Sequence, residues 1–138
     1  MVDTSVFVEY LAPGPSHQEV APLFDPDEDF ELWIPDLCLV EVTNSLRKRF
    51  LTDERFSPKH LAEGVADLLV LGLIVVSSRV LVEQAVRFAE NLTAYDAVYL
   101  VLAAARRLPV CTLDSDLAAE AKRSGIAVLV PGKDPLVS

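Results

Sequence analysis

The sequence predicts a single-domain α/β fold, because short apolar segments alternate with longer segments of helical period along the chain. Turn-forming residues separate the two kinds of segment, as expected where parallel strands are joined by crossover helices. A chain of 138 residues that is 51% hydrophobic also has enough apolar material for one packed core. We therefore expect residues 1–138 to form one domain with a central parallel sheet flanked by helices.

Five apolar segments have the length and composition of buried strands. Each is rich in apolar side chains and is bounded by polar or turn-forming residues. The predicted strands are residues 1–4, 30–34, 73–76, 109–112 and 127–130.

The segments between these strands have helical periodicity and recognisable ends. Ser78 and Thr93 are predicted to be N-caps. Pro35 and Pro58 stand where helices can begin. The predicted helices are residues 5–11, 16–24, 36–50, 58–71, 79–90, 94–108 and 115–124.

The charge of the chain is strongly acidic and unevenly distributed. There are 12 Lys and Arg residues against 21 Asp and Glu residues, and all 12 bases lie after residue 46. Five acids within residues 25–31 predict a solvated loop. A protein that binds nucleic acid through a broad basic surface is disfavoured, because such a surface needs clustered Lys and Arg.

The sequence also bears on the compartment. The first residues lack the basic and apolar regions of a secretory signal, and the longest apolar run, residues 68–76, is half the length that spans a bilayer. We therefore expect a cytosolic protein that does not enter a membrane.

Cysteine and histidine chemistry is disfavoured. Cys38 and Cys111 lie within apolar stretches without metal-ligand spacing, so they are predicted to be buried thiols. His17 and His60 lie in polar surroundings and are predicted to be surface residues.

Four acidic residues stand at positions that solubility alone does not explain. Asp3 and Asp114 end predicted strands. Glu41 interrupts an apolar run, and Asp96 lies in the first turn of a predicted helix. Asp116 is a fifth candidate. Helix capping is an alternative role for Asp3, Asp114 and Asp96, and the helix dipole also favours an acid at Asp96.

Glu41 is the hardest of these acids to explain by solvation. Valines flank it, and a buried carboxylate needs a cation or water to offset the cost of desolvation. The alternative is an exposed polar stripe, because Asn44, Ser45 and Lys48 follow it at helical spacings of three and four residues.

Topology can bring the four acids together. In an open parallel sheet, ligands bind beyond the carboxyl ends of the strands where the strand order reverses. If the order is 3-2-1-4-5, Asp3 and Asp114 become neighbours there. The helices that carry Glu41 and Asp96 can reach the same edge.

Clustered carboxylates repel one another and so raise one another's pKa. A bound Mg²⁺ or Mn²⁺ ion, which prefers oxygen ligands, relieves this repulsion. Such a metal site favours phosphodiester hydrolysis.

Four segments of the chain resemble, in order, the PIN-domain ribonucleases and, more narrowly, the VapC toxins of toxin–antitoxin pairs. The matching segments are residues 2–8, residues 34–37 with Glu41 and Asn44, residues 92–100 and residues 112–117. No single segment is specific, but the ordered set extends over essentially the whole chain at the family's usual separations.

The resemblance implies a PIN-like three-layer fold with the strand order 3-2-1-4-5 and Mg²⁺-dependent endoribonuclease activity, with Mn²⁺ as a substitute ion. Asp3, Glu41, Asp96 and Asp114 match the family's catalytic, metal-binding quartet. Asp3 and Asp96 are then direct metal ligands. Glu41 binds metal or positions water, and Asp114 completes the site.

The resemblance also implies auxiliary residues. Asp116 matches a position that varies within the family. Thr4, Ser5 and Thr112 match small hydroxyl positions that orient the carboxylates or the scissile phosphate, with capping and turn formation as the alternative. Fewer apolar residues precede Asp3 than is usual in the family, which predicts a minimal first strand.

The implied partners are an RNA substrate, a second copy of the chain in a homodimer, and an antitoxin. The antitoxin is expected to cover an apolar groove with a helix and to insert a basic residue among the acids. Candidate phosphate contacts are Arg47, Lys48, Arg49, Arg106 and Arg107, with interaction at helix C-termini as the alternative.

Three other functions remain open from sequence. One is a PIN nuclease that processes RNA without an antitoxin. Another is a phosphoryl-accepting or binding module with an acidic Mg²⁺ pocket, although the paired acids and the lysine of response-regulator receivers are not matched. The last is a scaffold without catalytic activity.

Overall fold

The computed structural model describes residues 1–136 and has its strands in two parallel pairs. β1 (Leu32–Pro35) pairs with β2 (Leu73–Val76), and β3 (Val110–Cys111) pairs with β4 (Val128–Leu129). Parallel pairing of strands that helices separate in sequence confirms the α/β class.

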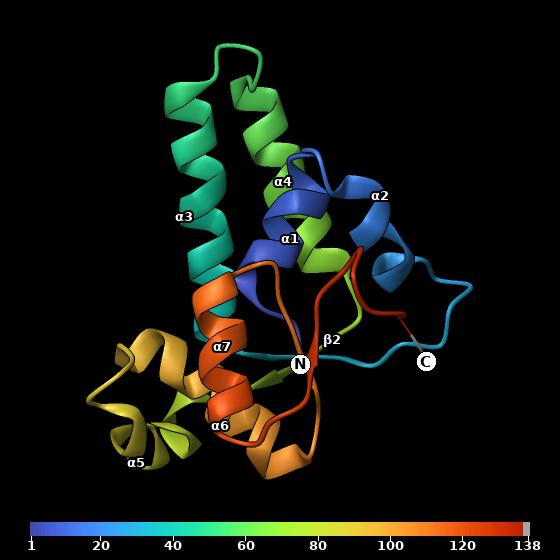
Figure 1. Ribbon diagram of the computed structural model, residues 1–138. Coiled ribbons are helices and arrows are strands. Elements are labelled where there is room, and N and C mark those ends of the chain that lie inside the picture. Colours follow the sequence, from blue (N-terminus) through green and yellow to red (C-terminus); the bar gives the residue numbers. More distant parts are fainter. Residues whose placement is uncertain (137–138) are drawn as a thin grey trace.

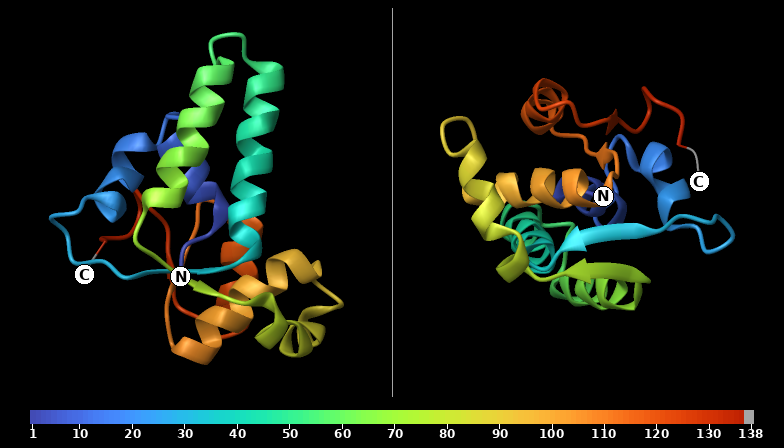
Figure 2. Two further views of the ribbon diagram at one scale, coloured as in Figure 1. Left: turned by 180° about the vertical axis from the view of Figure 1, so that it is seen from behind. Right: turned by 90° about the horizontal axis from the view of Figure 1, so that it is seen from below.

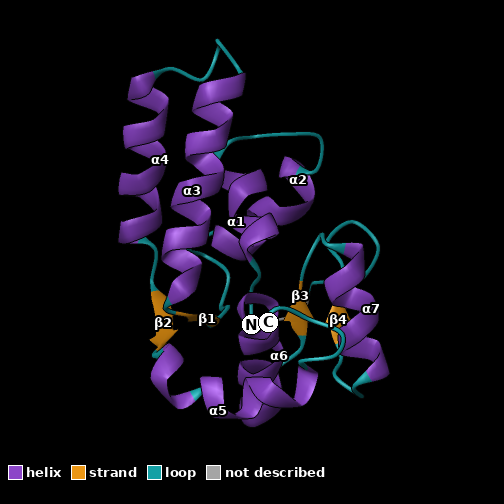
Figure 3. Cartoon of the chain, turned by 90° about the vertical axis from the view of Figure 1, so that its left-hand side faces the viewer, coloured by secondary structure: helices purple, strands orange, loops and turns teal. Residues whose placement is uncertain are grey.

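The start of the chain lies between the two strand pairs (Figure 3). Val2 forms one parallel bridge with Cys111, and its amide donates a 3.0 Å hydrogen bond to the carbonyl of Trp33. Asp3 then caps α1 (Thr4–Leu11), so the chain becomes helical after two residues. The predicted first strand, residues 1–4, is therefore reduced to a single bridge, and a continuous five-stranded sheet is not confirmed.

The remaining strands are close to their predicted positions but differ at their ends. The strand predicted at 30–34 is β1, which includes Pro35, so that Asp36 rather than Pro35 precedes the next helix. The strands predicted at 109–112 and 127–130 each retain two paired residues.

Five of the predicted helices are continuous. They are α1, α3 (Leu37–Thr52), α4 (Pro58–Val70), α6 (Ala94–Arg106) and α7 (Ser115–Arg123). Thr93 caps α6 as expected, by accepting a 3.3 Å hydrogen bond from the amide of Asp96. Arg107, with a φ of 54°, ends α6 before Leu108.

Two predicted helices are broken. Residues 16–24 form α2 (His17–Val20) and then a 3-10 helix, Ala21–Phe24, because Pro22 has no amide to continue an α-helix. Residues 79–90 become α5 (Val82–Ala85) between the 3-10 turns Ser78–Val80 and Val86–Phe88. Ser77, not Ser78, caps this region, because Ser78 instead hydrogen-bonds to the carboxylate of Asp36.

The strands lie between two groups of helices (Figures 1 and 3). On one side, α3 and α4 form an antiparallel pair that projects away from the strands, with α1 beside it (Figure 2). On the other side lie α5 and α6. α7 lies beside β4 at one end of the layer (Figure 3).

One hydrophobic core joins these layers. α6 contributes most to it, because every residue from 97 to 103 is buried. Phe7 of α1, Ile34 of β1 and Leu46 of α3 are fully enclosed as well. None of the helices within residues 1–136 is both long enough and apolar enough to span a membrane.

Candidate active site

Asp3 is held rigidly at the start of α1. Its side chain is 7% exposed. Oδ2 accepts hydrogen bonds from Ser5 Oγ at 2.7 Å, from Thr112 Oγ1 at 2.9 Å and from the Ser5 amide at 3.3 Å. The capping alternative is thus correct for Asp3. All of these hydrogen bonds go to Oδ2. Oδ1 has no hydrogen-bond partner within residues 1–136, so it can bind a further group.

Ser5 and Thr112 also tie Asp3 to the loop after β3. Ser5 Oγ accepts a 3.0 Å hydrogen bond from the amide of Leu113, and Thr112 Oγ1 accepts one of 2.9 Å from the amide of Asp114. Both hydroxyls therefore orient the Asp3 carboxylate while they shape the turn that leads into α7.

Glu41 faces the interior from the second turn of α3. Its Oε1 accepts hydrogen bonds from the hydroxyl of Tyr99 at 2.7 Å and from Thr4 Oγ1 at 3.4 Å. Burial raises the pKa of Glu41, the Tyr99 hydrogen bond opposes this effect, and the charges of Asp3 and Asp96 raise the pKa further. Glu41 is therefore not part of an exposed polar stripe.

Tyr99 is a residue of this site to which the sequence assigned no role. It is 1% exposed, lies on α6, and its hydroxyl is 2.8 Å from Thr4 Oγ1. The available signal is its position three residues after Asp96, which places both side chains on one helix face. A tyrosine in an apolar helix is more commonly a core residue, so this spacing alone does not identify it.

Asp96 is half-buried in the first turn of α6. Burial raises its pKa, and the charges of Asp3 and Asp114 add to this effect. The Asp96 amide donates a hydrogen bond to Thr93 Oγ1, and a hydrogen bond between Thr93 and the Asp96 side chain opposes the rise in pKa. The Asp96 carboxylate therefore experiences the charges of acids on two other segments.

Asp114 is the exposed N-cap of α7. Its Oδ1 accepts hydrogen bonds from the amides of Asp116 at 2.9 Å and Leu117 at 3.1 Å. The capping alternative is therefore correct here too, and Oδ2 has no hydrogen-bond partner within residues 1–136. The side chain of Asp116 is exposed and makes no hydrogen bond to the other acids in the described chain.

The donor chemistry of these acids fits a hard divalent cation. Asp3, Glu41, Asp96 and Asp114 offer only oxygen ligands, and no Lys or Arg of residues 1–136 forms an ion pair with any of them. Burial, and to a smaller extent the charges of the neighbouring acids, raise the pKa values of Glu41 and Asp96.

The acids do not form a ready-made metal cage. Across residues 1–136, no three Asp, Glu, His or Cys side chains are close enough together to hold a metal ion. The electrostatic coupling links Asp3, Glu41 and Asp96 to one another, and Asp96 also to Asp114. The four acids are therefore coupled pairwise through their charges.

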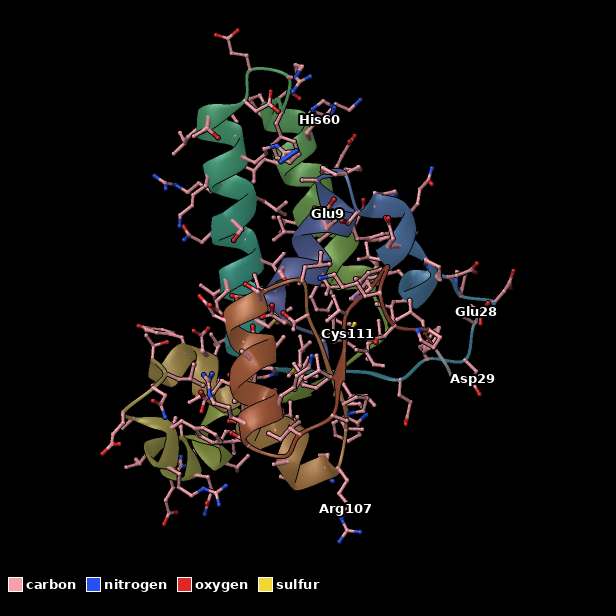
Figure 4. The ribbon with its side chains drawn as sticks, viewed as in Figure 1. Glu9, Glu28, Asp29, His60, Arg107 and Cys111 are labelled. Atoms are coloured by element: carbon pink, nitrogen blue, oxygen red, sulfur yellow. The ribbon has the colours of Figure 1, made fainter. Side chains whose placement is uncertain are left out.

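The predicted phosphate contacts have varied surroundings. Arg49 forms an ion pair with Asp53 at 3.4 Å, and the Arg106 guanidinium lies 5.0 Å from the centre of the Trp33 ring. Arg107 points away from the domain (Figure 4). The other two, Arg47 and Lys48, are exposed on α3.

The cysteines and His60 match the sequence predictions. Cys38 and Cys111 are buried, and burial raises the pKa of each thiol to about 11. His60 is exposed and caps α4 with Ser57 (Figure 4). His17 is partly buried and stacks on Tyr10, with 5.5 Å between the ring centres.

Comparison with known proteins supports the fold. Residues 1–123 match the family model described as the PIN domain. The structure is similar to VapC20 of Mycobacterium tuberculosis, described as a sarcin-ricin loop cleaving toxin, with a TM-score of 0.70 and 18% identity over 94% of this chain and 98% of that one. It is also similar to PAE2754 of Pyrobaculum aerophilum, with a TM-score of 0.63 and 22% identity over 94% of this chain and 86% of that one. No curated protein matches the sequence.

Proposed function

Because the chain belongs to the PIN-domain family, we propose that it is a divalent-metal-dependent endoribonuclease and the toxin of a toxin–antitoxin pair. The observation that carries the proposal is the coupling of Asp3, Glu41 and Asp96 without a compensating cation. The similarity to VapC20, a sarcin-ricin loop cleaving toxin, supports the choice of RNA as substrate.

We assign the four acids different parts in this reaction. Asp3 and Asp96 are the proposed direct metal ligands, and Glu41 and Asp114 complete the site. Lewis-acid activation of a phosphodiester and of water is the chemistry that Mg²⁺ or Mn²⁺ supplies when bound by such acids. The hydrogen bonds to Oδ2 keep Asp3 in one orientation and leave Oδ1 available.

Glu41 is suited to accept a proton from the attacking water. A carboxylate with a raised pKa is a stronger base than an ordinary one, and proton transfer is most efficient when the pKa approaches the working pH. The Tyr99 hydroxyl fixes one oxygen of Glu41 at 2.7 Å and leaves the other for the water. Neither a histidine nor a thiol is needed for this step.

The auxiliary roles follow from the same contacts. We assign Ser5 and Thr112 to the orientation of Asp3, and Thr4 to the orientation of Glu41 through its contact with Tyr99. Asp116 remains a candidate for a contact made only when substrate or metal is bound.

The partners belong to the proposal as well. We propose a cytoplasmic protein that acts as a homodimer and that is inhibited by an antitoxin whose basic residue enters the acidic site. A nuclease without an antitoxin is the main alternative. Co-expression with the product of the neighbouring reading frame separates the two, since only a toxin is expected to form a stable, inactive complex with it.

The activity is tested with purified protein and structured RNA in the presence of Mg²⁺ or Mn²⁺. Cleavage is expected in the wild type and in Asp29→Asn, a control in the exposed loop that points away from the site (Figure 4). Asp3→Asn and Asp96→Asn should each be at least 100-fold slower, on the order of the loss when a metal ligand is removed. Equal cleavage by all four proteins would mean that a contaminant cuts the RNA.

A further inference from the structure

A cavity of about 350 Å³ opens beside the candidate active site, along α7. Thr112 and Asp114 line one end, and Lys122 and Lys133 line other parts of the wall. The Thr112 hydroxyl donates the 2.9 Å hydrogen bond to Asp3, so the cavity adjoins the acids directly. We propose that it binds backbone phosphates of the RNA strand through Lys122 and Lys133, an inference that rests on the proposed nuclease function.

The face of α7 that lines the cavity leaves room for an RNA strand along the helix. The residues that it contributes lie on one helix face, and those between Asp114 and Lys122 have small side chains: Ser115, Ala118 and Ala119. The helix rises about 10 Å from Ser115 to Lys122. A strand cut at the acids can therefore run along α7 and place a neighbouring phosphate beside Lys122.

Lys122 is free to contact such a phosphate. It is exposed in the last turn of α7 and makes no ion pair with a carboxylate in the described part of the chain. The adjacent Arg123, in contrast, pairs with Glu120. The dipole of α7 favours a base at this position, but it does not account for a second lysine on a different segment.

Lys133 is presented by a fixed turn that follows β4. Its amide donates a 3.0 Å hydrogen bond to the carbonyl of Val130, and the Val130 amide donates one of 2.8 Å to Asp134 Oδ2. Gly132 has a φ of 85°, and a Cβ there would lie 3.0 Å from Glu19 Cγ on α2. The turn therefore packs closely against α2 and holds Lys133 at the cavity.

The charges at the cavity explain how an acidic protein can bind RNA here. Lys122 and Lys133 line the cavity together with Asp134, whose Oδ2 is already bound, and Asp114, which belongs to the acid quartet. A phosphate seated between the lysines gains two cationic contacts beside the acids. The phosphate at the acids would instead rely on bound metal. One phosphate of the strand would then lie at the metal held by the acids, and a neighbouring phosphate at Lys122 and Lys133. RNA could bind in this way without a broad basic surface.

The test compares Lys122→Gln/Lys133→Gln with Lys59→Gln/Arg87→Gln, a control that removes two exposed charges elsewhere. Lys122→Arg/Lys133→Arg keeps the charge. For each, KM and kcat for single-stranded RNA are measured with Mn²⁺ at several salt concentrations. Binding of labelled RNA by fluorescence anisotropy is measured in the Asp96→Asn background, in which the strand is not cut.

The lysine-to-glutamine pair is expected to raise KM and the dissociation constant about tenfold while kcat changes less than twofold, because a lost phosphate contact weakens binding without altering the reacting groups. The slope of log affinity against log salt should fall by about 1 to 1.5. The arginine pair should behave like the wild type.

Two outcomes separate this inference from the proposed function. If the glutamine pair and the control have the same KM and salt slope while the wild type cleaves RNA, the phosphate site is wrong and the nuclease function stands. If the wild type does not cleave but its RNA affinity depends on the lysine pair, the phosphate site stands and the nuclease function is wrong.

Discussion

The hydroxyl of Tyr99 donates a 2.7 Å hydrogen bond to Oε1 of Glu41, across 58 positions of sequence. Tyr99 is buried on α6, and Glu41 faces it from α3. The same hydroxyl lies 2.8 Å from Thr4 Oγ1 at the start of α1. One buried phenol thus joins the three helices that carry Asp3, Glu41 and Asp96.

We predict that Tyr99→Phe lowers kcat about tenfold, a change of about 1.4 kcal/mol in the activation free energy. Loss of the donor should also raise the pKa of Glu41, because the Tyr99 hydrogen bond lowers that pKa. The acidic limb of the pH–rate profile should therefore move to higher pH. The measurement is kcat as a function of pH.

Tyr95→Phe is the matched control for this change, because Tyr95 lies on the same helix and is 66% exposed. Its pH–rate profile should coincide with that of the wild type. An unshifted profile in Tyr99→Phe would show that Glu41 does not set the acidic limb.

Thr112→Val should weaken metal binding about 10- to 100-fold, as expected when a residue that orients a ligand is lost. The substitution removes the 2.9 Å hydrogen bond to Asp3 and the acceptor for the Asp114 amide at a fully buried position. Unfolding free energy should fall by about 1 to 3 kcal/mol. Calorimetric titration with Mn²⁺ and denaturant unfolding measure the two effects.

Thr112→Ser retains the hydroxyl and should bind Mn²⁺ nearly as well as the wild type. Thr43→Val, which removes an exposed hydroxyl bonded to Leu39 on α3, should change neither quantity appreciably. If Thr112→Ser lost as much affinity as Thr112→Val, side-chain volume rather than the hydrogen bond would be responsible.

Asp96→Asn is expected to stabilise the metal-free protein at pH 7. The pKa values of Glu41 and Asp96 are raised in the folded state, so this state binds protons more tightly than the unfolded chain does. The stability that these groups contribute is present at low pH. It is lost as pH rises from the ordinary carboxyl range, near 4, through the raised values.

At pH 7 the folded protein therefore carries both the desolvation cost of the Asp96 carboxylate and its repulsion by the neighbouring acids, and Asp96→Asn relieves both. We expect the melting temperature in EDTA to rise by about 1 to 3 °C, since both groups are partly exposed and solvent screens them. Mg²⁺ should raise the melting temperature of the wild type but not of the variant. A lower melting temperature in EDTA for Asp96→Asn than for Asp29→Asn would contradict the claim that the ionised Asp96 carboxylate destabilises the metal-free protein.

The two thiols should resist alkylation in the native protein. Burial raises the pKa of Cys38 and of Cys111 to about 11, so the reactive thiolate is scarce at pH 8 as well as inaccessible. Mass spectrometry after iodoacetamide treatment should find both cysteines unmodified in buffer and modified in urea. Rapid native labelling of either residue would indicate local opening of the strand layer or of α3.

Local features of the sequence were sufficient for the fold class, for the five continuous helices and for the caps at Asp3, Thr93 and Asp114. These depend on side chains within a few residues of one another, so their periodicity and spacing are visible in the sequence. The breaks at 16–24 and 79–90 were not predicted, whereas the minimal first strand was, because only two residues precede Asp3. Only the break at Pro22 has a local signal; Ser78 is diverted by Asp36, 42 positions away.

The sequence by itself determined which carboxylates were candidates, because Asp3 and Asp114 follow short apolar segments and Glu41 interrupts an apolar helix face. Only the tertiary structure decided how they are held. The hydrogen bonds from Thr112 to Asp3 and from Tyr99 to Glu41 span 109 and 58 positions, and the Lys122–Lys133 cavity needs α7 beside the turn after β4. Such contacts arise from the packing of distant segments, and no local pattern encodes that packing.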